Sequence, residues 1–358
     1  MNKMLNILTV LLCGLFILIF SVWCFTGATP DYSESERRVL ASFPEFNMEN
    51  VSKGKFASDF EKYSTDRFPL RDFFRSLKAY TRLYAFMQKD NNDLFTVEGH
   101  LSKLQYPYKE VMTSHATEVF SYVKETYLKD NKIYASVIPD KNMFIAEDNG
   151  YLSLDYEAFE KEIKESMPYA EYIGISHLLS KDDYYPTDTH WRQEKITDVA
   201  KHLAESMGKT LDDTYTENVL DHPFNGVYVG QSALRVQPDT ITYLTNDTIN
   251  NLQVEGASAV YDMDKAHGKD PYEIFLSGNQ TVVKIKNPAN PEGGRLIIFR
   301  DSFGSSITPL LCEAYSEVVL VDLRYISSTL LSDFVDFKDA DVLFMYSTVL
   351  LNDSFSLK

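Results

Sequence analysis

The chain has 358 residues, of which 44% are apolar and 13% aromatic, so it is long enough to bury a sizeable core in one large domain or two smaller ones. Its formal net charge of −17 argues against nucleic acid as a partner, because nucleic-acid phosphates are bound by Lys and Arg. Two of the three cysteines lie in an apolar N-terminal segment, and the single Cys312 in the rest of the chain excludes an internal disulfide there.

The N-terminal segment is the first predicted element. Residues 5–25 are almost wholly apolar and carry no charge, and this length is enough to cross a bilayer as a helix. Lys3 precedes the segment and Asp31 follows it, which predicts a cytoplasmic N-terminus and an extracytoplasmic bulk. A cleaved signal peptide is the alternative, and the protein would then be secreted. We interpret residues 1–28 as a single-pass membrane anchor.

Residues 29–92 are predicted to form a helical stalk or cap. Apolar and aromatic side chains recur there at helical spacing between residues 71 and 87. These side chains belong to Phe73, Phe74, Leu77, Tyr80, Leu83, Tyr84 and Met87. The periodicity predicts one apolar helix face, and we expect this face to pack in a core rather than to form a binding surface.

Residues 93–358 have the alternation of an α/β domain. Strands are predicted at 133–138, 296–299, 318–321 and 342–345, and helices at 113–128, 156–166, 193–207, 306–315 and 329–334. Such strand–helix–strand spacing is typical of a parallel sheet with right-handed crossovers. Turn residues punctuate short β-branched runs between about 208 and 290, and we interpret this interval as a β-rich insertion.

A serine follows the strand at 296–299. Ser302 lies on the turn between this strand and the next predicted helix, so its hydroxyl is expected at the carboxyl edge of the sheet, where ligands of such sheets bind. The amino terminus of the helix beside it offers N–H groups that can stabilise an oxyanion. The alternative is that Ser302 is only a turn or capping residue.

Far upstream, Asp188 and His190 offer an imidazole base and a carboxylate to orient it. A serine hydroxyl needs such a base to become a nucleophile, and the base needs its tautomer fixed. The alternative assigns both residues to the start of the following helix. His190 and Glu194 could also bind a divalent ion, but no second histidine lies at ligand spacing, so we expect no metal and no cofactor.

Four further residues are candidates for binding the substrate or an oxyanion: Arg300, Arg324, Gly278 and Asn279. Arg324 follows the strand at 318–321 and is therefore expected at the same edge of the sheet, where it could bind an acyl donor, a carboxylate or a sugar oxygen. An ion pair with Asp322 or Asp301 is the alternative. For the Gly-Asn pair the alternative is a plain turn.

Several segments, taken in order, carry a family resemblance. They are residues 35–44 (SERRVLASFP), 66–72 (DRFPLRD), 137–141 (VIPDK), 185–191 (YPTDTHW), 275–279 (FLSGN), 300–304 (RDSFG) and 322–325 (DLRY). On these segments the chain resembles the DHHW proteins and the periplasmic alginate O-acetyltransferase-like proteins, which have an SGNH-hydrolase-like fold. Thr189 departs from the DHHW signature and looks like the Asp-Thr-His-Trp form of the acetyltransferases. No carbohydrate-binding domain is evident after the core.

The resemblance implies that Ser302 is a nucleophile, His190 its base and Asp188 the partner of that base. It also implies a membrane-anchored extracytoplasmic serine acyltransferase that O-acetylates an exopolysaccharide or cell-wall glycan. A membrane O-acyltransferase partner would supply the acetyl group. A carbohydrate acetylesterase is one alternative, and a non-catalytic glycan-binding component of a polysaccharide secretion complex is another.

Overall fold

The computed structural model describes residues 2–27, 30–212 and 214–358. Within these residues the chain divides into two compact units. The N-terminal unit comprises the chain up to residue 92 together with 229–235, and the α/β unit comprises 93–228 and 236–358. The boundary after residue 92 therefore separates the helices that follow the apolar segment from the α/β alternation.

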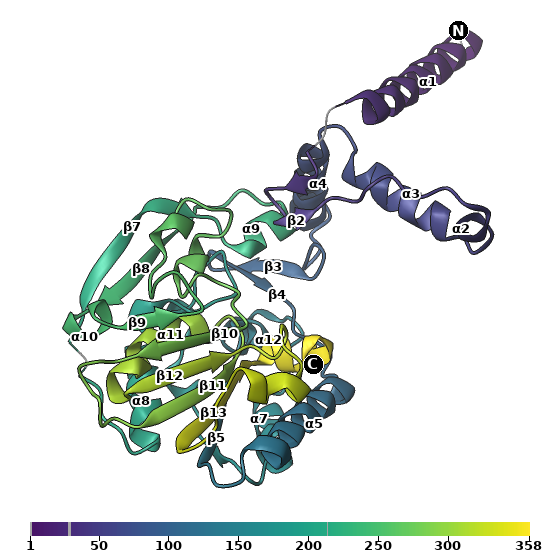
Figure 1. Cartoon of the computed structure of the whole chain (residues 1–358). Coiled ribbons are helices and arrows are strands. Elements are labelled where there is room, and N and C mark those ends of the chain that lie inside the picture. Colours follow the sequence, from purple (N-terminus) through teal and green to yellow (C-terminus); the bar gives the residue numbers. More distant parts are fainter. Residues whose placement is uncertain (1, 28–29, 213) are drawn as a thin grey trace. The chain divides into compact units, whose positions relative to one another are not determined.

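The α/β unit is built on a seven-stranded sheet with the order β6-β5-β13-β11-β12-β10-β9 (Figure 1). The strands are β5 (Ile133–Ile138), β6 (Glu171–Tyr172), β9 (Gln253–Glu255), β10 (Val282–Lys286), β11 (Arg295–Arg300), β12 (Glu317–Val321) and β13 (Ala340–Ser347). The first five strands in the order pair in parallel, whereas β10 is antiparallel to both β12 and β9. The predicted α/β class with a mostly parallel sheet is thus confirmed.

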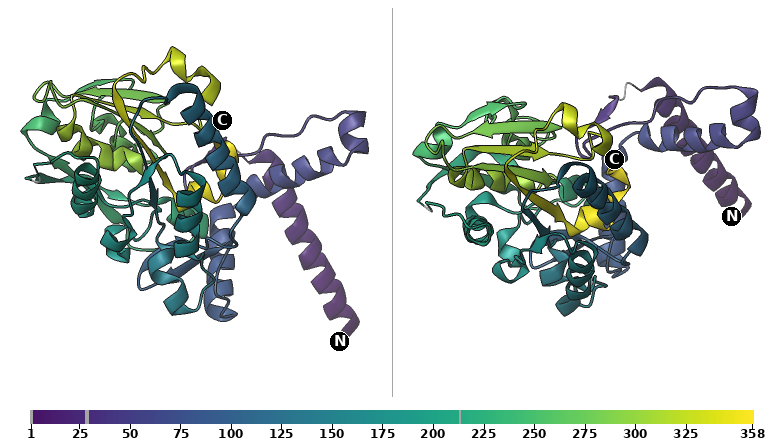
Figure 2. Two further views of the ribbon diagram at one scale, coloured as in Figure 1. Left: turned by 90° about the horizontal axis from the view of Figure 1, so that it is seen from below. Right: turned by 60° about the horizontal axis from the view of Figure 1, so that its bottom comes forward.

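Helices cover both faces of this sheet (Figure 2). Successive residues of β11 alternate between two hydrophobic clusters, with Leu296 and Ile298 in one and Ile297 and Phe299 in the other. The first cluster includes α8 (Thr197–Ser206) and α11 (Gly304–Leu311), and the second includes α5 (Glu110–Tyr127) and α7 (Tyr156–Ser166). Because both faces are buried, the central strands are continuous apolar runs in the sequence.

The shorter elements of the chain are β3 (Leu94–Val97), β4 (His100–Lys103), α6 (Asn142–Ile145), β7 (Thr216–Phe224), α9 (Val227–Ser232), β8 (Asp239–Thr245), α10 (Asp247–Asn250) and α12 (Thr348–Leu351). Strands β7 and β8 form a separate antiparallel pair, as do β3 and β4. The interval of about 208–290, which was predicted as one β-rich insertion, therefore contributes to two different sheets. Its first two strands pair with each other, whereas β9 and β10 extend the main sheet, because Val283 and Ile285 are buried beside β12.

Two predicted helices differ from the observed elements. The last one is a 3₁₀ segment, Ser328–Asp333, rather than an α-helix. The helix predicted from residue 193 begins as a separate 3₁₀ turn, Gln193–Lys195, and continues as α8. The cause lies in the buried side chain of Gln193, whose Nε2 donates to the Ser306 carbonyl (2.6 Å) and whose Oε1 accepts from the Leu244 N–H (2.7 Å). These two bonds hold the turn against α11 and β8.

The N-terminal unit is mainly helical and contains one pair of very short strands. They are α1 (Asn2–Thr26), β1 (Tyr32–Ser33), β2 (Arg38–Val39), α2 (Met48–Ser52), α3 (Lys55–Asp66), α4 (Arg71–Tyr80) and the π-helical turn η1 (Thr81–Ala85). Among the described residues, only the stretch Lys3–Cys24 within α1 is long and apolar enough to cross a membrane, and a signal sequence would pass the same test.

The apolar face of α4 is where a prediction fails. Phe73, Leu77, Tyr80 and Tyr84 were expected in a core because of their helical spacing, but all four side chains are exposed. The opposite side of the helix is the one that packs, since Arg75 lies 3.4 Å from the Glu36 carboxylate and both side chains are largely buried. The prediction of core packing for this face is therefore wrong.

Candidate active site

The turn after β11 lies at the carboxyl edge of the parallel sheet. Asp301 begins this turn, and its Oδ1 accepts a hydrogen bond from the Phe303 N–H (3.0 Å). Its Oδ2 accepts from the N–H and the hydroxyl of Ser347 at the end of β13, at 2.8 and 2.6 Å. The turn is thus tied to the neighbouring strand, and Ser302 is held at this edge.

Three of the predicted site residues meet there. His190 Nδ1 lies 2.6 Å from Asp188 Oδ1, and His190 Nε2 lies 2.8 Å from Ser302 Oγ. A carboxylate only accepts hydrogen bonds, so the imidazole proton belongs on Nδ1. Nε2 is then free to accept the proton of the Ser302 hydroxyl. This geometry suits general-base activation of a serine.

Asp188 is buried and its carboxylate is fully engaged. Besides His190 Nδ1, it accepts from the His190 N–H (3.1 Å) and, through Oδ2, from the Val227 N–H (2.7 Å). Burial alone would raise the pKa of this carboxyl, but the charge of His190 and these hydrogen bonds hold the pKa well below its usual range. Asp188 is therefore ionised whenever His190 must carry a proton.

Aromatic packing fixes the plane of the imidazole. The His190 ring stacks on Tyr272 with centroids 4.0 Å apart and an interplanar angle of 10°, and it also contacts Phe303 at 4.9 Å. The Tyr272 hydroxyl donates to Ser306 Oγ (2.9 Å), and Trp191 Nε1 donates to the Phe303 carbonyl (3.1 Å). The sequence contains no motif that marks Tyr272, so its contact with the base could not be predicted.

Gly226 lies against the loop that carries the carboxylate. A Cβ at this position would come within 2.3 Å of the Thr187 carbonyl oxygen and 2.5 Å of Asp188 Cβ. We expect Gly226→Ala to displace Asp188 and to lower kcat by about 10- to 100-fold with little change in KM, since small misplacements of catalytic groups cost this much. Steady-state kinetics with p-nitrophenyl acetate as substrate measures the effect. Gly174→Ala is the matched control, because its Cβ would meet nothing closer than 3.8 Å.

Lys141 lies three residues after the end of β5 and is fully buried. Its Nζ donates to the carbonyl oxygens of Leu101 (2.6 Å), Tyr185 (2.8 Å) and Pro186 (3.3 Å). These three acceptors match the three N–H bonds of an ammonium group. Two of them belong to the loop that leads into Asp188, so Lys141 positions this loop. Lys141 belongs to residues 137–141, one of the segments that carry the family resemblance, but the sequence alone did not predict these hydrogen bonds.

We expect Lys141→Met to reduce the free energy of unfolding by about 1–3 kcal/mol near pH 7, because three buried carbonyls lose their donor. Burial lowers the pKa of Lys141 to about 7, whereas a lysine of the unfolded chain has a pKa of about 10.4. Between these values the unfolded chain binds more protons than the folded one, so this group makes the unfolding free energy rise with pH.

The measurement is chemical denaturation of both proteins from about pH 6 to about pH 10. Relative to Lys141→Met, the natural chain should gain stability as the pH rises through this window. The exposed Lys161 gives the control variant Lys161→Met, which should keep the pH dependence of the natural chain. Equal pH slopes with and without Lys141 would contradict the assignment.

The expected oxyanion donors are only partly available. The first two N–H groups of α11 donate within the turn, from Gly304 to the Asp301 carbonyl (3.1 Å) and from Ser305 to the Ser302 carbonyl (3.2 Å). Gly278 has a φ of +76° and ends a turn whose two preceding residues also have positive φ. Asn279 is exposed. The roles of Gly278 and Asn279 as substrate or oxyanion ligands stay predictions.

The two arginine candidates share one carboxylate. Arg324 binds Asp322 through Nε (2.9 Å) and Nη2 (2.6 Å), which is the ion pair given above as the alternative. Arg300 is fully buried, with its Nη1 3.6 Å from Asp322 Oδ2. Arg300 therefore presents no atom to a substrate, and its prediction as a substrate ligand is corrected to a buried ion-pair partner. Arg324 is partly exposed and stays a candidate.

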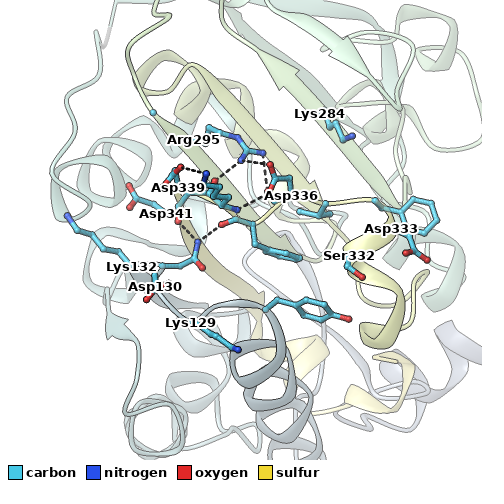
Figure 3. A pocket seen from close by; sticks show the side chains of 18 residues that line it. Lys129, Asp130, Lys132, Lys284, Arg295, Ser332, Asp333, Asp336, Asp339 and Asp341 are labelled. Carbon is cyan, nitrogen blue, oxygen red and sulfur yellow. Dashed lines mark hydrogen bonds and ion pairs between the residues drawn. The ribbon is translucent and has the colours of Figure 1, made fainter.

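A cavity of about 1160 Å³ lies at the other edge of the sheet (Figure 3). It is lined at the starts of β5, β11 and β13 by side chains that include Lys132, Arg295 and Asp341. Ser302 follows the opposite end of β11, so this cavity is separate from the candidate active site. Within the described residues, no group of three or more His, Cys, Asp or Glu side chains is arranged to hold a metal ion.

The α/β unit is thus a mostly parallel sheet covered by helices on both faces, with a serine, a histidine and an aspartate joined at its carboxyl edge. No family model and no curated protein sequence matches the chain. Solved structures do match it.

A DHHW family protein from Eubacterium siraeum aligns with a TM-score of 0.55 and 21% identity over 73% of this chain and 93% of that one. PatB1 of Bacillus cereus aligns with a TM-score of 0.55 and 14% identity over 73% and 97% of the two chains. PatB1 with a sulfonyl adduct aligns with a TM-score of 0.53 and 16% identity over 72% and 95%. The resemblance noted from sequence is thus confirmed at the level of the fold.

Proposed function

We propose that this protein is a membrane-anchored extracytoplasmic serine acyltransferase that O-acetylates an exopolysaccharide or cell-wall glycan. The observation that carries the proposal is the unbroken hydrogen-bond chain from Asp188 through His190 to Ser302. The resemblance to DHHW and alginate O-acetyltransferase-like proteins supports the glycan as acceptor and a membrane O-acyltransferase as the source of the acetyl group. The apolar helix α1 supports attachment to the membrane.

The reaction has two halves that use the same base. In the first, His190 Nε2 takes the hydroxyl proton while Ser302 Oγ attacks the carbonyl carbon of the acetyl ester, and the departing alcohol receives that proton. An acetyl-serine remains. In the second, His190 takes the proton of a sugar hydroxyl, whose oxygen attacks the acetyl carbon and releases Ser302 with its proton restored. Asp188 stabilises the imidazolium at both stages.

A direct test offers the purified protein p-nitrophenyl acetate with and without glycan oligomers, and mass spectrometry detects an acetyl group on the oligomer. Transfer to the oligomer supports an acyltransferase. Release of free acetate alone supports the acetylesterase, which differs only in the acceptor. A sulfonyl fluoride, which reacts with activated serines, should label Ser302 in the natural chain. No turnover together with an unlabelled Ser302 would leave the non-catalytic glycan-binding alternative.

A further inference from the structure

The anchor helix packs directly on the start of α4. The Phe20 ring stacks on Phe68 with centroids 5.4 Å apart and meets Phe74 edge-on at 6.2 Å. Phe20 belongs to the apolar stretch Lys3–Cys24, not to the polar residues that follow it. The corner between α3 and α4 therefore lies beside the last turns of the apolar stretch, within the same compact unit.

The side chains that α4 turns outward are apolar. Phe73, Leu77 and Tyr80 follow one another at spacings of four and three residues, so they share one helix face, and Leu70 directly precedes the helix. We call these four side chains the outer face of α4. Their exposed fractions are 55%, 59%, 50% and 39%. A contiguous exposed face of this kind marks an interaction surface, since soluble proteins rarely leave one uncovered.

The backbone of Leu70 supports the same conclusion. This residue has a φ of +56°, in the left-handed region that disfavours side chains with a Cβ. Glycine or asparagine would adopt this conformation at less cost, yet the chain places an exposed leucine there. Strained conformations of this kind cost free energy and cluster at functional sites. Here the strained residue adds an apolar side chain to the outer face.

The polar side of α4 is already engaged. Arg71 and Arg75 both bind the Glu36 carboxylate, and Arg38 binds Asp66 with an Nη1–Oδ2 distance of 2.8 Å. The charges near the corner are therefore neutralised inside the unit. On the outer face, the Tyr80 hydroxyl accepts a hydrogen bond from the Arg235 N–H (3.3 Å), and the other three side chains are apolar.

The distribution of charge indicates what covers the outer face. Residues 30–92 contain eleven Lys and Arg against ten Asp and Glu, whereas residues 93–358 contain 23 against 42. The net charge is therefore +1 (11 − 10) for residues 30–92 and −19 (23 − 42) for residues 93–358, so the part beside the anchor is nearly neutral. A bilayer with anionic lipids would repel the acidic part but not residues 30–92.

We propose that the outer face of α4 is embedded beside α1 in the lipid of the outer leaflet of the membrane that α1 crosses. The chain would then be held by two attachments, a spanning helix and an amphipathic helix lying in the interface, where aromatic side chains are favoured. The inference rests on the proposed function only in that α1 stays in the membrane. It does not depend on acyl transfer.

The test uses the full chain in vesicles of equal parts phosphatidylethanolamine and phosphatidylglycerol, with or without a dibrominated phosphatidylcholine. Phe73→Trp is made in a Trp23→Phe background, where the buried Trp191 is the one remaining native tryptophan. Brominated lipid should remove most of the fluorescence added at position 73. Phe355→Trp is the matched control, because Phe355 is equally exposed (64%) but belongs to the α/β unit, and its fluorescence should not change.

Each other outcome overturns the proposal in a recognisable way. If the protein sediments with the vesicles but position 73 is not quenched, the anchor stands and the inference is wrong. A blue-shifted but unquenched emission would mean that a second copy or another protein covers this face. If the protein does not sediment, both the anchor and the inference fail. Should Phe73→Trp not fold, as judged by its circular dichroism spectrum, Leu77→Trp reports on the same face.

Discussion

Ser302→Ala is expected to lower kcat/KM for acyl transfer by about 10⁴- to 10⁶-fold, because no other atom of the site can form the acyl intermediate. His190→Ala should cause a loss of similar size, since the hydroxyl is inert without its base. The two groups act as one unit through a 2.8 Å hydrogen bond. The double variant should therefore be no slower than either single variant.

Rates of p-nitrophenyl acetate turnover for the natural chain and the three variants measure this prediction. Ser305→Ala is the control, because Ser305 is a neighbouring buried serine whose hydroxyl takes no part in the chain from Asp188 to Ser302. It should keep most of the activity. Full activity in Ser302→Ala would remove the catalytic proposal. Losses that multiply in the double variant would show that the two residues act separately.

The strands of the sheet were predicted well because of how they are buried. Every residue of β5 is buried, so the strand stands in the sequence as an apolar run broken only by the small Ser136, and its predicted bounds agree with the observed ones. Strand β10 lies nearer the edge and alternates buried Val283 and Ile285 with lysines. That pattern is weaker and lies among turn residues, so the strand was assigned to an insertion rather than to the sheet.

The site was predictable where residue type and position carry the information. Ser302 follows a buried strand, and His190 lies two residues after Asp188, so their chemistry could be inferred before their meeting was known. The Val227 N–H on the Asp188 carboxylate could not be inferred, because any residue except proline supplies a backbone donor. Periodicity likewise predicted an apolar face on α4 but could not tell whether protein covers it.

Asp322→Ala is expected to reduce the free energy of unfolding by about 3–5 kcal/mol, because it leaves a buried guanidinium without its counter-charge. Asp322 and Arg300 are both fully buried, and burial already lowers the pKa of Arg300. Arg324 is partly exposed and can turn to water when its partner is lost. Chemical denaturation measures the change. Asp336→Ala removes an exposed carboxylate 3.8 Å from Arg295, and it should cost at most about 0.5 kcal/mol.

A second substitution separates the loss of charge pairing from the loss of packing. Arg300→Met keeps an unbranched side chain in the core but removes the charge, so in the Asp322→Ala background it should restore about 1–3 kcal/mol of the lost stability. In the natural background the same change should destabilise, since it leaves Asp322 with Arg324 alone. If Arg300→Met makes Asp322→Ala less stable still, the cost of Asp322→Ala comes from a cavity and not from an unpaired arginine. Only the first outcome agrees with Arg300 as a buried ion-pair partner.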